Sequence, residues 1–147
     1  MKSLFTPETY VEIEKRINNL SNSSTASWGK MDVAQMLCHC KYPLKIALRN
    51  KSPKIKPNIL AKILFKKSMY NNRPWRKNLP THPSLKITDQ KVFDTEKTEL
   101  LELVSSFYDE RNKKEWNPHP IFGTFTPQQW GQLQYKHLDH HLKQFNV

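Results

Sequence analysis

TPQQWGQLQYKHLDHHLKQF, residues 126–145, is the stretch that decides the fold, because it has every mark of one long amphipathic helix. Thr126 is the expected N-cap, Pro127 occupies the first helical position, and Gln129 completes a capping box. Apolar side chains then recur at helical spacing. They predict one buried face, formed by Trp130, Leu133, Leu138, Leu142 and Phe145.

Four polar side chains fall on or beside this apolar face. His137 and His141 are four residues apart, so their imidazoles lie one above the other on the helix. Gln134 and Gln144 lie on or beside the same arc. Buried polar groups are costly unless they are paired or face a cleft, so this face is predicted to hold a site. The wheel places three charged residues on the opposite side, Lys136, Asp139 and Lys143.

The rest of the chain predicts three further long helices, at residues 7–20, 32–48 and 94–111. Thr6, Asp32 and Asp94 are their expected N-caps, Gln35 completes a capping box with Asp32, and Pro43 should kink the second helix. Residues 50–57 form a break, residues 58–69 a short basic amphipathic helix, and residues 73–83 a proline-rich connection. With only three glycines in the chain, we expect an all-α protein. The predicted fold is a four-helix bundle in a single domain, 1–147, with one extra short helix and a long connection between helices two and three.

The formal net charge of +11 is distributed unevenly. Between Val33 and Thr88 there are thirteen Lys or Arg and no Asp or Glu. Such a segment can attract polyanions, acidic ligands or an anionic membrane surface. Because its basic residues are spread over helices and loops, the preferred interpretation is a solvated face that keeps the protein soluble. No apolar run has the ~18 residues that a membrane span needs, and the N-terminus lacks the apolar stretch of a secretory signal. Cys38 and Cys40 point to different helix faces, which excludes a disulfide between them and favours a reducing cytoplasm.

His39, on the second predicted helix, is the candidate for a third ligand beside His137 and His141. Imidazole suits Zn, Ni, Cu and Fe, and bundle cores commonly hold such sites on facing helices. Three neutral nitrogens leave a metal its full charge and an open position, as in catalytic sites.

Other histidines and the cysteines have simpler interpretations. A histidine pair four apart is also common on surfaces and in hydrogen-bonded cores, and Leu138 stands where a zinc protease has glutamate. The side chains of 38–40 diverge by about 100° each, which argues against a shared Cys/His site. His82 and His119 each precede a proline and are expected to be structural, with lining of the pocket as the alternative. His140 is expected to face solvent.

Two segments resemble the DinB/YfiT-like superfamily. HLDHHLKQ, residues 137–144, is similar to its last-helix signature, in which His-x-x-x-His is followed closely by Gln, and WGKMDVAQMLCHC, residues 28–40, resembles its second-helix segment. HPIFG at 119–123 and residues 126–130 resemble an uncharacterised branch of small bacterial proteins. The resemblance implies an up-down-down-up bundle, a divalent metal held by His39, His137 and His141, frequent homodimers, and relatives that use a low-molecular-weight thiol. Lys143 stands where the superfamily often has glycine.

The leading hypothesis is a cytoplasmic metal-dependent transferase or hydrolase, with Zn or Ni activating a thiol or water. Gln134 and Gln144 would orient substrate or support the ligands, with His119 as a weaker candidate. Arg73 and Arg76, with Lys77, would suit an acidic small-molecule substrate or thiol. The alternatives are a polyanion-binding protein that uses residues 41–77 and a bundle that binds metal without turnover. Nucleic acid is not the expected partner, since no element is shaped for base readout.

Overall fold

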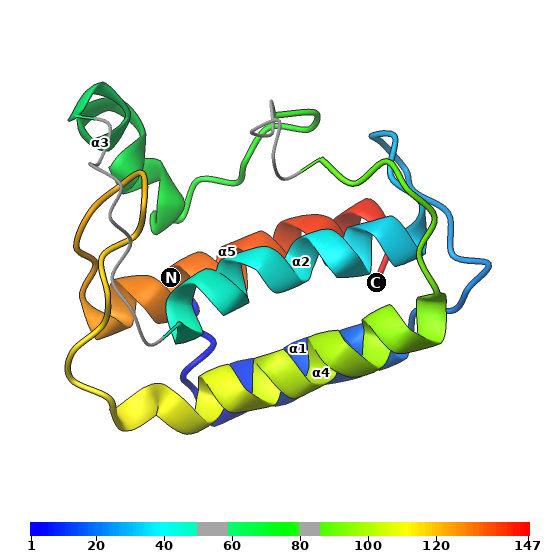
Figure 1. The fold of residues 1–147 in the computed structure, drawn as a ribbon, viewed down its shortest axis with the longest axis horizontal. Helices are drawn as coiled ribbons and strands as arrows, with labels where there is room; N and C mark the ends of the chain where they lie inside the picture. The colour runs from blue at the N-terminus through cyan, green and yellow to red at the C-terminus, as the bar shows by residue number, and fades with distance from the viewer. Residues whose placement is uncertain (50–58, 80–85) are drawn as a thin grey trace.

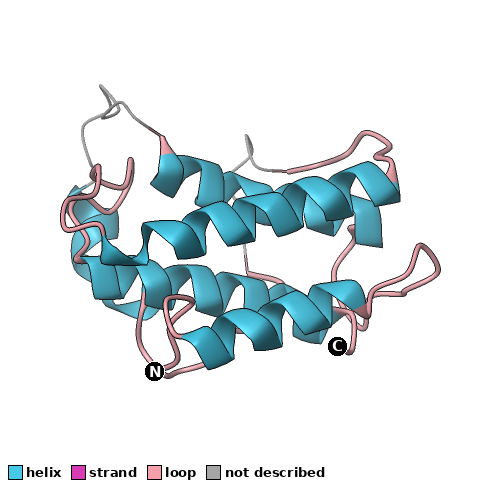
Figure 2. Ribbon diagram, turned by 90° about the horizontal axis from the view of Figure 1, so that it is seen from below, coloured by secondary structure: helices cyan, strands magenta, loops and turns pink. Residues whose placement is uncertain are grey.

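The computed structural model describes residues 1–49, 59–79 and 86–147, and these form a helical bundle (Figures 1 and 2). Its long helices are α1 (Pro7–Asn18), α2 (Val33–Leu48), α4 (Phe93–Asp109) and α5 (Pro127–Gln144). The short elements are α3 (Ile59–Phe65) and the 3₁₀ turns η1 (Lys66–Met69) and η3 (Glu110–Asn112). No strand occurs in these ranges, where His119 and Gly123 form an isolated bridge. The prediction of an all-α four-helix bundle is confirmed.

The helices run up, down, down and up, as expected (Figure 1). α1 and α5 point in one direction and α2 and α4 in the other, and the described residues between α2 and α4 return along the length of the bundle. α2 packs on α4 and α5, and α1 packs on the same two helices. The four helices therefore enclose one apolar core, which includes Ile13, Ile17, Met36, Leu44, Leu100, Phe107, Trp130 and Leu142.

The predicted helix starts are confirmed where a capping box was expected. The side chain of Asp32 accepts from Gln35 N at 2.8 Å, and Gln35 Oε1 accepts from Asp32 N at 3.1 Å. Thr126 and Gln129 form the same reciprocal pair at the start of α5. Two boundaries differ from the prediction: α1 ends at Asn18, and α4 begins at Phe93 with Val92 as its N-cap instead of Asp94. α2 continues as a helix through Pro43.

Two ion-pair groups join the helices across the bundle. Arg16 Nη1 on α1 lies 2.8 Å from Asp139 Oδ1 on α5. The buried Lys41 on α2 pairs with Glu96, at 2.5 Å, and with Glu99 on α4. Lys41 is therefore not available to bind an external polyanion, although it is the first basic residue of the 41–77 segment.

The expected break at 50–57 and the residues 80–83 of the proline-rich connection, with His82, lie outside the described residues. The predicted short helix is present as α3 and η1, but the four apolar residues expected on one side of it are exposed: Ile59, Leu60, Ile63 and Leu64. No helix in the described part of the chain is long and apolar enough to cross a bilayer.

Candidate metal centre

Three histidines from two helices converge in the interior. His39 comes from α2, His137 and His141 come from α5, and each is at most 9% exposed. One ligand nitrogen from each ring can be chosen so that all three lie within 4.8 Å of one another. The Nε2 atoms of His39 and His137 are 3.2 Å apart. The structure thus brings together the three residues that the sequence pattern singled out.

The separation of one pair of these nitrogens matches a shared metal ion. Two imidazole nitrogens on a tetrahedral zinc, each about 2.0–2.1 Å from it, lie roughly 3.3–3.4 Å apart. The 3.2 Å observed between His39 Nε2 and His137 Nε2 is close to that value. The same pair of nitrogens can also share a proton as a hydrogen bond.

Burial keeps two of the three rings neutral, as metal ligands must be. The pKa of His141 is lowered to about 3, mainly by removal from water and also by the neighbouring His39, while the bond to Gln144 opposes the shift. Burial also holds the pKa of His137 well below 6.5, assisted by repulsion from His141 and His39. At neutral pH these two imidazoles present lone pairs instead of positive charges.

Gln144 determines which nitrogen of His141 carries the proton. Its amide Nε2 donates to Trp28 O at 2.6 Å, so its Oε1 is the atom that faces His141 Nδ1 at 2.9 Å. A carbonyl oxygen only accepts, so His141 Nδ1 must be the donor. The lone pair of His141 is therefore on Nε2, the nitrogen left for a metal.

Gly29 makes room for this arrangement. It has φ +85°, and a Cβ at this position would lie 2.5 Å from Gln144 Nε2. Only glycine combines that backbone conformation with so close an approach. The loop between α1 and α2 consequently reaches the end of α5, where Ser27 N also donates to Gln144 O at 2.7 Å.

Gln134 lies one turn before His137 on the same face of α5. It is fully buried, and its Nε2 donates to Pro43 O on α2 at 2.9 Å. Its Oε1 and His137 Nδ1 are both buried without a hydrogen-bond partner. Residues three apart on a helix are neighbours, so a small rotation of the Gln134 amide is expected to pair these two orphaned atoms.

Two tryptophans, which the sequence analysis did not select as site residues, lie beside the triad. The ring of Trp75 is 6.0 Å from that of His137 and 5.8 Å from that of His140. The ring of Trp28 also lies 5.8 Å from that of His140. His140, expected to face solvent, is therefore half-buried beside two indoles. The one available signal was the presence of Trp75 in a proline-rich connection of the kind that often covers a pocket.

Lys136 was placed on the outer side of α5 by the helical wheel, and this prediction is wrong. It is 8% exposed, and its Nζ donates to Ser68 O at 2.7 Å and to Asn71 O at 3.0 Å. It also lies 5.4 Å from the centre of the Trp75 ring. Burial lowers its pKa to about 8. The wheel failed because η1 and the segment after it cover this face of α5, so Lys136 ties that cover to the helix.

The other predicted site residues lie apart from the triad. His119 stacks among Phe122, Phe125 and Trp130, and its Nδ1 accepts from Ile121 N at 3.1 Å, while burial lowers its pKa to about 4. These contacts suit the structural interpretation. Arg73 and Arg76 are exposed in the segment after η1.

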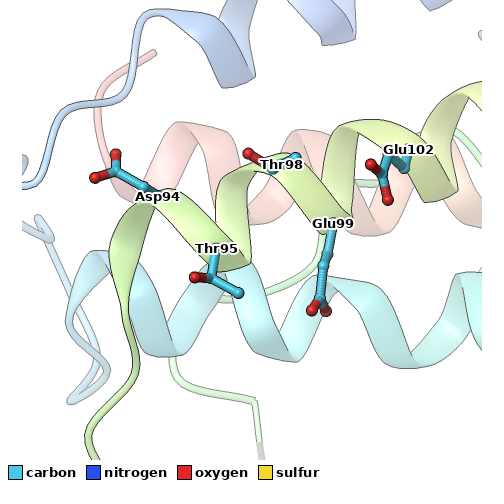
Figure 3. A pocket seen from close by; sticks show the side chains of 5 residues that line it. All are labelled: Asp94, Thr95, Thr98, Glu99 and Glu102. Carbon is cyan, nitrogen blue, oxygen red and sulfur yellow. The ribbon is translucent and has the colours of Figure 1, made fainter.

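A cavity of about 400 Å³ lies along α4, lined by Asp94, Thr95, Thr98, Glu99 and Glu102 (Figure 3). No histidine lines it. Its carboxylates come from one helix, and Glu99 points toward α2, where it is paired with Lys41. It does not belong to the triad.

Comparison with protein families gives one match. A family model described as a protein of unknown function, DUF1569, matches residues 6–147. The comparison with curated proteins found no match, and neither did the comparison with solved structures.

Proposed function

Since the chain belongs to the DUF1569 family of proteins of unknown function, we propose its function from the site itself: a metalloprotein, and a metal-dependent enzyme of the DinB/YfiT-like type. His39, His137 and His141 would hold one divalent transition ion, with Zn or Ni as the best candidates. The observation that most supports this proposal is that one ring nitrogen from each of three histidines on two helices lies within 4.8 Å of the others in the interior. The up-down-down-up order of the bundle supports the same superfamily.

A bound ion of this kind lowers the pKa of a thiol or water and polarises a carbonyl. Three neutral ligands leave it an undiminished positive charge and room for another ligand. A reaction of the transfer or hydrolysis class, with a low-molecular-weight thiol or water as nucleophile, is the chemistry that such a donor set suits.

The chain's own residues would hold and shield the site. Gln144 fixes the proton of His141 on Nδ1, and we expect Gln134 to do the same for His137. Trp75 and Trp28 supply apolar walls beside His140. The exposed Arg73 and Arg76 lie in the same segment as Trp75, where they would attract an acidic substrate.

The test is the metal content of protein purified without a histidine tag and without chelator. We expect close to one Zn or Ni per chain, and His137→Ala or His141→Ala should lose most of it while helical circular dichroism stays nearly unchanged. His39→Ala should behave likewise, because the bundle has its own apolar core. A wild-type protein that takes up neither ion at micromolar concentration would refute the proposal.

The alternative of a nucleic-acid-binding protein has weaker support. Lys41 is buried, and the guanidinium of Arg49 donates to Pro118 O at 2.6 Å, so part of the 41–77 segment is used internally. Replacing Arg73, Arg76 and Lys77 by Gln should weaken an acidic ligand and leave metal content unchanged. If the segment binds DNA, the same change should instead reduce the salt slope by up to about three.

A further inference from the structure

α3 carries an apolar surface that the bundle does not use. Nine large apolar side chains are exposed among the described residues, and five of them lie on this one helix: Ile59, Leu60, Ile63, Leu64 and Phe65, at 54–75% exposure. Ile59 with Ile63, and Leu60 with Leu64, are four apart and share a face. α3 packs mainly on η1, which directly follows it. Monomeric proteins rarely expose so concentrated an apolar patch unless something binds to it.

The stretch of chain that follows this patch is basic. Lys67, Arg73, Arg76 and Lys77 are exposed in the residues that follow α3. No Asp or Glu occurs anywhere between Val33 and Thr88. The partner that fits must therefore accept aliphatic side chains and carry negative charge.

The charges are separated across the molecule. Of the thirteen acidic residues, three lie in α1 and five in α4. Figure 1 shows α3 and the segment after η1 on the side of α2 and α5 that faces away from α1 and α4. This asymmetry would orient the protein with α3 toward an anionic surface.

We propose that α3, together with Lys67, Arg73, Arg76 and Lys77, is a docking surface for an anionic lipid bilayer. The aliphatic side chains of α3 enter the headgroup and acyl boundary, while the basic side chains contact lipid phosphates. A second copy of the chain fits less well, because it would bring two basic surfaces together. Nucleic acid also fits less well, because four of the five exposed side chains are aliphatic and offer no stacking to bases.

The experiment is vesicle flotation of the full chain, with phosphatidylcholine vesicles compared with vesicles containing 30% phosphatidylglycerol. We expect at least about ten-fold tighter binding to the anionic vesicles, with the gain lost at high salt. Binding should be the same in EDTA, because α3 contains none of the three histidines. This separates the proposal from that of the metal centre.

Two variants with matched controls test the surface. Ile63→Gln with Leu64→Gln should weaken vesicle binding at least about ten-fold, whereas Val92→Gln, also exposed but outside α3, should not. Lys67→Gln and Arg73→Gln should each cost about five-fold, and Lys15→Gln on α1 should cost nothing. Melting temperatures should stay unchanged, since all these side chains are exposed.

Three results would overturn the proposal. The first is equal binding to both kinds of vesicle. The second is a homodimer in sedimentation equilibrium that Ile63→Gln with Leu64→Gln dissociates, which would make the patch a self-interface. The third is salt-sensitive binding to duplex DNA with no binding to vesicles.

Discussion

Zinc binding should resist acid far better than an exposed histidine site does. We consider the zinc affinity of tag-free protein at pH 7 and at pH 5.5. An ordinary imidazole with pKa 6.5 is about 90% protonated at pH 5.5, which weakens metal binding about ten-fold for each ligand. Three such ligands would lose about a thousand-fold.

The geometry of the triad reduces that loss. With the pKa of His141 at about 3 and that of His137 well below 6.5, neither ring takes up a proton in this range. At most the third ligand contributes, so we expect the zinc affinity to fall by no more than about ten-fold. Calorimetric titration in two buffers of different ionisation enthalpy measures both the affinity and the protons released, and fewer than one proton should leave per zinc near pH 6.

Thermal denaturation gives an independent measure of the same binding. Zinc at a hundred times its Kd should stabilise the fold by about 2.7 kcal/mol, or roughly 5–11 °C for a chain of this size. His119→Asn, which removes a partly buried histidine outside the triad, should retain the full shift. A thousand-fold loss of affinity at pH 5.5, or release of two to three protons, would refute the inference that burial keeps the ligands neutral.

Three further predictions concern groups around the triad. Gln144→Ala should weaken zinc binding about ten-fold or more at unchanged helical content, because His141 loses the acceptor that fixes its proton on Nδ1. Gln144→Glu restores the acceptor and should recover much of the lost zinc affinity. Equal zinc affinities of the wild type and Gln144→Ala would contradict this role. Lys136→Met should lower the free energy of unfolding by about 1–3 kcal/mol, since the carbonyls of Ser68 and Asn71 lose their donor. It should also speed proteolysis near Trp75. An unchanged rate of proteolysis would show that Lys136 does not hold the segment after η1 against α5. In the folded protein the pKa of His119 is about 4, below the 6.5 of a free histidine, so the unfolded state binds a proton first and the free energy of unfolding falls as the pH drops below about 6.5. His119→Asn should reduce the pH dependence of the free energy of unfolding, measured by urea denaturation between pH 6.5 and 4. An unchanged pH dependence would rule out His119 as its origin.

Much of the fold could be predicted from local signals. Both capping boxes are confirmed, because these contacts depend on residues three apart. The choice of His39 for the triad followed from its place near the apolar arc of its helix and from the family resemblance. Lys136 was misplaced and His140 was expected to face solvent, because a helical wheel cannot include cover by a distant segment. The position of Trp75 beside the triad and the hydrogen bond between Trp28 and Gln144 depend on how loops cross the bundle. The hydrophobic periodicity of the helices carries no information about these loop paths.

The distance between His39 and His137 along the chain has a kinetic consequence. They are 98 residues apart, so the pair exists only after α2 and α5 have packed. The unfolded chain holds only the pair His137 and His141, four apart. If the three-nitrogen site forms after the folding transition state, zinc should leave the refolding rate nearly unchanged and slow unfolding by up to about a hundred-fold at a hundred times its Kd. The ion would then bind only after the bundle has formed and would lengthen the lifetime of the native state.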